Sequence, residues 1–390
     1  MSIGLLLLLL LVPAIDAVAA PFIPQSDQQV LETLTARAAE PRMRELRELR
    51  RELSNDPRNL DVAVRLARRY YEEAAAEGDP RYLGYAQAAL APWWSEPDPP
   101  VPARVMRAIV LQYSHEFDKA VADLDAAVKQ QPGNGEAWAW LAAISMVRAD
   151  YAQARRACEH MAPLASPLIA VACRANVDAM TGKAAAGATA LRSALLESPR
   201  AAPEESLWAL TRLAEIEDRR GEHKGAEDAY RRALALGLSD VYLLAAYGDF
   251  LLDRGRPAEV LALLKDKARS DLLLLRLALA AKASNAPALA GWESDLAARF
   301  DAARLRGDTL HQKEEARFAL GVRGQAQKAL TLARENYAMQ RESADARILL
   351  EAALAAKQPA AAEPALKWMA DSGIESFALK ALAQKLKGAN

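Results

Sequence analysis

The chain has 390 residues and a formal net charge of −1, from 50 basic and 51 acidic side chains. This balance excludes the strongly basic surface by which many proteins bind nucleic acid, and the length exceeds what one globular core usually spans. Alanine and leucine are abundant, glycine and proline gather in short breaks, and strand-like alternation is missing. We therefore predict an all-α protein.

The N-terminus predicts export. Residues 3–12 form a run of ten apolar residues, which suits the core of a signal peptide and is too short to span a bilayer. The sequence Ala17-Val18-Ala19 is an A-x-A cleavage signal, so we expect residues 1–19 to be removed and Ala20 to begin the mature chain. Removal takes away Asp16 and no base, which leaves a net charge of zero. We expect a periplasmic protein, with secretion or membrane anchoring as alternatives.

Residues 20–55 are interpreted as a leader that ends in a capping helix. The segment 41–53 places four apolar side chains on one helical stripe and arginine and glutamate on the rest. A basic amphipathic helix can bind anionic lipid. Glutamates offset the arginines here, so we favour a cap on a repeat array. The stripe consists of Met43, Leu46, Leu49 and Leu53.

A repeat with a period near 34 residues occupies residues 56–269. A small residue recurs at the expected centre of each second helix, where the backbones of two helices approach most closely. The steps between these residues are 34, 34, 33, 39 and 34. They are Ala86, Ala120, Ala154, Gly187, Ala226 and Val260.

Residues 270–373 are predicted to be divergent repeats. The small residue recurs at Ala329 and near Glu363, whereas the register of a repeat near residues 290–294 cannot be assigned. The run after Asp271, LLLLRLALAA, is apolar on all sides and short, which favours a buried helix over a membrane segment. Residues 374–390 are predicted to form a C-terminal capping helix.

Residues 91–102 interrupt the repeats with five prolines, which exclude a continuous helix and indicate a stiff connector. Trp93 and Trp94 in this segment could form an exposed docking site or a lid over the adjacent hairpin. We favour the lid.

Several short motifs share the spacing of one known repeat. They are Trp138-x₂-Leu141-Ala142, Phe117-x₂-Ala120-x₃-Leu124 with Pro132, and Gly221 followed by Ala226-x₃-Tyr230-x₂-Ala233. The chain resembles the tetratricopeptide repeat over most of its length. That resemblance implies a right-handed α-solenoid of about nine helix pairs, whose first helices line a concave face that binds a protein partner.

The sequence gives no indication of an enzyme, a cofactor or a metal site. The four histidines lie in different repeats or at turns, and none belongs to an H-E-x-x-H or Ser/His/Asp pattern. Gly133-Asn134-Gly135 is interpreted as a repeat turn rather than a phosphate-binding loop. We therefore predict a non-enzymatic protein without a cofactor.

Cys158 and Cys173 are the two cysteines of the chain. They are expected on helices that pack together across a repeat boundary, and an oxidising compartment would favour a disulfide between them. Two buried free thiols remain the alternative. A metal site with His160 would lack a fourth ligand.

Projecting the repeat register predicts the residues of the concave face. The early part is mixed polar with methionine, which suits adaptable apolar contacts, and the later part is acidic, which favours a basic partner segment. In the competing interpretation, the acids pair with Arg219, Arg220 and Arg254 and face no ligand. The predicted groove residues are Gln112, Tyr113, Met146, Asn176, Met180, Thr211, Glu215, Asp218, Asp249 and Asp253.

Together these features predict an exported scaffold that binds a protein partner through its groove, in the assembly or transport of the cell envelope. The alternative is a structural accessory of a membrane complex, held by an uncleaved N-terminal anchor. The N-terminal residue of the mature protein distinguishes the two.

Overall fold

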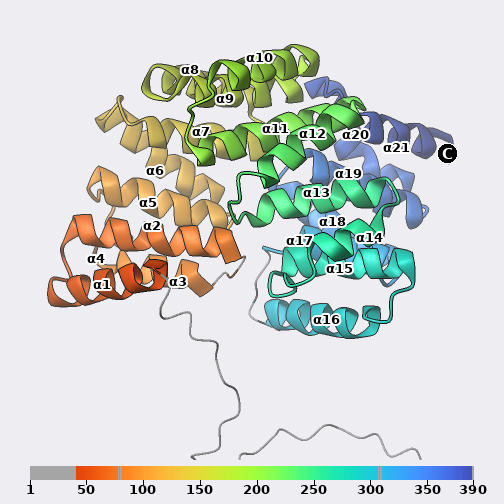
Figure 1. Cartoon of the computed structure of the whole chain (residues 1–390), viewed down its shortest axis with the longest axis horizontal. Coiled ribbons are helices and arrows are strands. Elements are labelled where there is room, and N and C mark those ends of the chain that lie inside the picture. The colour runs from red at the N-terminus through yellow and green to blue at the C-terminus, as the bar shows by residue number, and fades with distance from the viewer. Residues whose placement is uncertain (1–40, 78, 80, 306, 308–309, 389–390) are drawn as a thin grey trace, which may run out of the picture. The chain divides into compact units, whose positions relative to one another are not determined.

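The computed structural model describes residues 41–77, 79, 81–305, 307 and 310–388, and within these residues the regular structure is entirely helical (Figure 1). Leu46–Asn390 form one compact unit. The all-α fold class predicted from the sequence is confirmed. The predicted signal peptide, residues 1–19, and the leader up to residue 40 lie outside the described residues.

Nine helix pairs follow one another within the described part of the chain, in the manner of tetratricopeptide repeats. The first helices are α2 (Leu60–Glu77), α5 (Val101–Tyr113), α7 (Gly135–Val147), α9 (Pro167–Met180), α11 (Pro203–Arg220), α13 (Val241–Asp253), α15 (Asp271–Ser284), α17 (Gln312–Gly321) and α19 (Ser343–Ala355). The second helices are α3 (Arg81–Ala89), α6 (Phe117–Gln130), α8 (Tyr151–Met161), α10 (Ala184–Glu197), α12 (His223–Leu234), α14 (Pro257–Leu263), α16 (Leu289–Leu305), α18 (Ala326–Met339) and α20 (Glu363–Ser372).

Three further helices and two short 3₁₀ turns complete the described elements. The helices are α1 (Pro41–Asn55), α4 (Ala91–Trp94) and α21 (Phe377–Gly388), and the 3₁₀ turns are η2 (Ala162–Leu164) and η3 (Pro359–Ala362).

Small residues hold the two helices of a pair together. Ala120, Ala154 and Ala226 have no exposed surface. At Gly187 a β-carbon would lie 2.9 Å from the carbonyl oxygen of Ala175, so α9 and α10 approach too closely for any side chain there. This close contact explains why the pairs tolerate drift elsewhere but keep small residues at these positions.

The pair α15–α16 explains why the sequence pattern is lost near residues 290–294. Leu296 and Phe300 of α16 are buried, and they pack with Leu274 and Phe318 in a separate apolar cluster. Large side chains therefore fill the space that alanine leaves to the helix backbone in other pairs. The run after Asp271 forms the buried helix α15, as predicted.

Short polar signals set the helix ends. The side chain of Asn134 accepts a hydrogen bond from the backbone N–H of Ala137 at 3.0 Å and begins α7. Gly221 ends α11 with a positive φ of 83°, a conformation that costs a residue without a β-carbon little.

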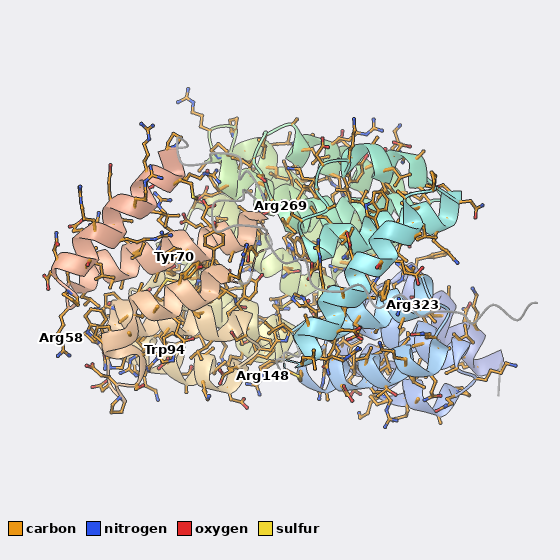
Figure 2. All side chains as sticks on the ribbon, turned by 90° about the horizontal axis from the view of Figure 1, so that it is seen from below. Arg58, Tyr70, Trp94, Arg148, Arg269 and Arg323 are labelled. Atoms are coloured by element: carbon orange, nitrogen blue, oxygen red, sulfur yellow. A yellow bond between two sulfur atoms is a disulfide. The ribbon has the colours of Figure 1, made fainter. Side chains whose placement is uncertain are left out.

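The connector after α3 is not wholly irregular, because α4 forms within it. Trp93 is buried against Ala63 and Ala103, and Arg107 donates hydrogen bonds to the carbonyl oxygens of Trp93 and Trp94 at 3.2 and 2.8 Å. Trp93 therefore acts as a lid on the adjacent hairpin. Trp94 is partly exposed beside it (Figure 2).

Within the part of the chain that the structure describes, no helix combines the length and apolar character needed to cross a membrane.

A disulfide joins Cys158 of α8 to Cys173 of α9, with their Cα atoms 5.7 Å apart. It links the second helix of one repeat to the first helix of the next. Both residues are buried, so the bond lies inside the stack rather than on its surface.

Replacing both cysteines by serine should lower the free energy of unfolding by about 3 kcal/mol, because the bond closes a loop of 15 residues in the unfolded chain. Urea unfolding of the two proteins measures the change. Adding a reductant should bring the wild-type midpoint to that of the variant. Equal midpoints without a reductant would show that the bond does not form in solution.

Candidate ligand cavity

Helices that are far apart in the sequence meet around the inner face of the repeats. The last helix, α21, contacts α11, and α13 contacts α2 (Figure 1). The backbone N–H of Arg341 donates to the carbonyl oxygen of Val147 at 2.7 Å, and Trp368 Nε1 donates to the hydroxyl of Tyr151 at 2.9 Å. The C-terminal repeats therefore contact the earlier repeats across the concave side of the stack.

A cavity of about 640 Å³ lies on this inner face. Its wall comes from the first helices of consecutive pairs, α7 to α19, together with residues of α12 and α21. This volume is within the range of pockets that bind small ligands or short chain segments.

Seven of the ten predicted groove residues line the cavity. They are Met146, Asn176, Met180, Glu215, Asp218, Asp249 and Asp253.

The other three predicted groove residues lie elsewhere. The prediction that Thr211 lies in the groove is wrong. Thr211 is buried, and its hydroxyl donates to the carbonyl oxygen of Leu207 in the same helix at 2.8 Å. Its neighbour Arg212 faces the cavity instead. Tyr113 packs edge-on against Tyr71, outside the cavity wall, and Gln112 precedes it at the end of α5.

Asp249 is held by two arginines from later repeats. Arg276 donates to its two carboxylate oxygens at 3.0 and 2.7 Å, and Arg317 donates to the same oxygens at 2.8 and 2.9 Å. Burial alone would raise the pKa of Asp249, but the two guanidinium groups outweigh it and hold the pKa well below its usual value. Asp249 is therefore a structural anion that joins α13 to α15 and α17.

Asp253, one helical turn further on, is held by one arginine across the inner face. Arg347 of α19 donates to its carboxylate oxygens at 2.5 and 2.7 Å, although 94 residues separate the two in the sequence. This pair joins the two sides of the cavity in a bidentate contact.

The two acids of α11 are also engaged. Glu215 lies 3.1 Å from Arg212 and accepts a hydrogen bond from the hydroxyl of Tyr242. Asp218 accepts a hydrogen bond from Arg254. The four predicted acids therefore do not form a free acidic surface, contrary to the expectation from the sequence.

The three arginines named in the competing interpretation behave differently from one another. Arg254 pairs with Asp218, whereas Arg220 pairs with Glu217, 3.1 Å away. Arg219 lines the cavity, and its Nε and Nη2 atoms are buried without a hydrogen-bond acceptor among the described residues.

Sequence reasoning missed the side of the cavity formed by the C-terminal repeats. Lys313 and Arg317 come from α17, Arg347 from α19 and Phe377 from α21. Phe377 lines the cavity with an apolar ring that is 69% exposed. The spacing of a repeat gives no signal for residues that approach from the opposite side.

The fold and the cavity define a helical-repeat protein with a partly open cavity on its inner face. No family model matches the chain, and no curated protein matches it. Similar solved structures include yeast Tom70, at 15% identity, a TM-score of 0.44 and coverage of 89% of this chain and 62% of that chain. The human IFIT1 dimer with m7Gppp-AAAA has 14% identity, a TM-score of 0.46 and coverage of 85% of each chain.

A tetratricopeptide repeat protein from Parabacteroides merdae is similar at 12% identity, with a TM-score of 0.38 and coverage of 73% of this chain and 98% of that one. The chain spans 62% of the Tom70 chain and 52% of the chain matched in the Cut9–Hcn1 hetero-tetramer. All these TM-scores are below 0.5, so the likenesses carry no conclusion about function.

Proposed function

We propose that this protein is an exported, non-enzymatic scaffold that takes a short segment of a partner protein into its inner cavity. The cavity carries this proposal, because its volume of about 640 Å³ suits a few residues of a chain rather than a folded domain. Its wall combines methionines, an exposed phenylalanine and charged side chains, which together can hold an extended segment.

Two features support the export part of the proposal. The N-terminal sequence has the pattern of a signal peptide, and the chain's two cysteines form a disulfide, a bond that persists mainly in oxidising compartments. We propose the periplasm as the compartment and envelope assembly or transport as the process. The exported protein should begin at Ala20 when its N-terminus is sequenced, and a retained Met1 would favour an uncleaved anchor instead.

Photo-crosslinking tests the binding site. A photoreactive phenylalanine analogue at Phe377, in the cavity wall, should capture the partner in cells. The same analogue at Leu196 of α10, which is 77% exposed and outside the cavity wall, should not. The matched positions separate cavity binding from general surface contact.

A second pair of variants tests whether the cavity must be open. Ala378 lines the cavity and is exposed, so Ala378→Trp should narrow the cavity while the fold is kept. Crosslinking at Phe377 should then fall, while Ala185→Trp on α10, outside the cavity wall, should leave it unchanged. Equal crosslinking at Phe377 and Leu196, or no effect of Ala378→Trp in a folded variant, would overturn the proposed site.

A further inference from the structure

Cationic side chains outnumber carboxylates in the wall of the cavity. Its wall carries seven arginine and lysine side chains against six aspartates and glutamates. The excess is one positive charge, and the pairing of the charged side chains shows where in the cavity it lies.

Every carboxylate of the cavity wall already has a partner. The four acids of α11 and α13 are engaged as described above. Glu314 lies 3.9 Å from the ammonium group of Lys313, and the Glu342 side chain accepts a hydrogen bond from the backbone N–H of residue 345. The six carboxylates of the cavity wall therefore offer a basic ligand no group without an internal partner.

The charged groups with unmet hydrogen-bond donors are guanidinium groups instead. Arg219 has two buried nitrogen atoms without an acceptor among the described residues, and the Nε atoms of Arg212 and Arg254 are in the same situation. A buried donor without an acceptor loses its hydration and gains nothing in return. Arg212 and Arg254 already hold Glu215 and Asp218 through other atoms, so the unmet donors of Arg219 are those that point to an acceptor from outside the chain.

The repeat register explains why Arg219 has no internal acceptor. Asp253 lies 34 residues after Arg219, in the equivalent position on the next first helix, but Arg347 holds its carboxylate from across the cavity. On the other side, the equivalent position is Met180, 39 residues earlier, which offers no charge. Arg219 therefore faces the cavity between an apolar residue and a carboxylate that is already occupied.

We infer that the cavity recognises an oxyanion, a carboxylate or a phosphate, carried by the bound segment, and that Arg219 is its anchor. The inference rests on the proposed function and specifies the chemistry of the segment. A planar guanidinium with two free N–H groups matches the two oxygens of such an anion. The side chains of Met146, Met180 and Phe377 provide apolar contacts for the rest of the segment.

Titration calorimetry with glutarate and with inorganic phosphate tests the inference on the intact protein at constant ionic strength. At least one anion should bind the wild-type protein, and Arg219→Gln should weaken that binding roughly ten- to hundredfold, as expected for a lost charged hydrogen bond. The control is Arg232→Gln, because Arg232 lies outside the cavity wall, is about half exposed and pairs with Asp228 at 3.6 Å. This variant should bind as the wild-type protein does.

The two anions distinguish the source of the charge. Tighter binding of glutarate assigns an acidic side chain or a chain terminus, and tighter binding of phosphate assigns a phosphorylated residue. Absence of binding by both anions would overturn the inference, as would equal binding by folded Arg219→Gln and wild-type protein. If crosslinking at Phe377 persists in those cases, the proposed function stands without an anion site. If anions bind through Arg219 but no partner is crosslinked, the proposed function fails alone.

Discussion

Replacing Asp249 by asparagine should lower the free energy of unfolding by about 3 kcal/mol at neutral pH. The change leaves Arg276 and Arg317 facing each other without their shared anion, and breaking a buried ion pair on one side costs about 3–5 kcal/mol. We expect the lower end of that range, because the Asp249 side chain is 27% exposed. Urea unfolding followed by circular dichroism measures the difference.

Asp253→Asn is the matched control for Asp249→Asn. Asp253 lies on the same helix and also faces the cavity, but a single arginine, Arg347, holds it. That arginine keeps a second partner, Glu351, at 2.7 Å. Asp253→Asn should lower the free energy of unfolding by about 1 kcal/mol or less, as for other partly exposed ion pairs. Equal losses from the two variants would show that the double arginine contact at Asp249 adds nothing.

The effect of Asp249 should also depend on pH in a defined direction. Its pKa in the folded chain is well below the ordinary value of 3.8. The unfolded chain therefore takes up the proton first as the pH falls, and the contribution of Asp249 to stability decreases below about pH 4. The difference between wild-type protein and Asp249→Asn should shrink between about pH 4 and pH 2. A difference that stays constant over this range would contradict the pKa argument.

The sequence was sufficient to predict the local architecture. A helix pair is stabilised mainly by contacts between residues close in the chain, so Ala120, Ala154 and Ala226 mark its centre by their size alone. The inner face followed from the same period, which is why seven of ten expected residues line the cavity. Thr211 was misplaced because a shift of one residue turns a helical side chain by about 100°, and Arg212 holds the inner position.

The sequence could not predict what covers the inner face. The contacts Asp253–Arg347 and Asp249–Arg317 join residues 94 and 68 positions apart. Such contacts depend on the small rotation that each repeat adds, and these rotations accumulate over many pairs. The repeat register identifies the acids of the inner face but not their partners from distant repeats. The sequence therefore predicted an acidic groove. The complete fold supplies the arginines and leaves Arg219 as the group without an acceptor.

The pKa of the buried Asp345 is shifted in the opposite direction from that of Asp249. It has no exposed surface, and it accepts hydrogen bonds from Asn336 and from the backbone N–H of Glu342, both at 2.9 Å. Lys313 lies 3.6 Å away and favours the charged form. Burial outweighs this attraction and, with the nearby charge of Glu342, raises the pKa of Asp345 to about 6.

This raised pKa fixes the sign of a second pH effect. The ordinary value for aspartate is 3.8, so the folded chain holds the proton of Asp345 more tightly than the unfolded chain does. The resulting stability is fully present below about pH 4 and is lost as the pH rises through about 6. The loss should be about 2–3 kcal/mol, since each pH unit between the two pKa values corresponds to about 1.4 kcal/mol.

Asp345→Asn should remove this pH dependence, because the amide keeps the size of the side chain and does not titrate. Urea unfolding of both proteins at several pH values between 4 and 7 isolates the effect, since the two proteins share every other titratable side chain. The wild-type protein should lose stability relative to Asp345→Asn as the pH rises, whereas it should gain relative to Asp249→Asn between pH 2 and 4. A difference for Asp345→Asn that is flat, or that increases with pH, would show that Lys313 rather than burial controls this carboxylate.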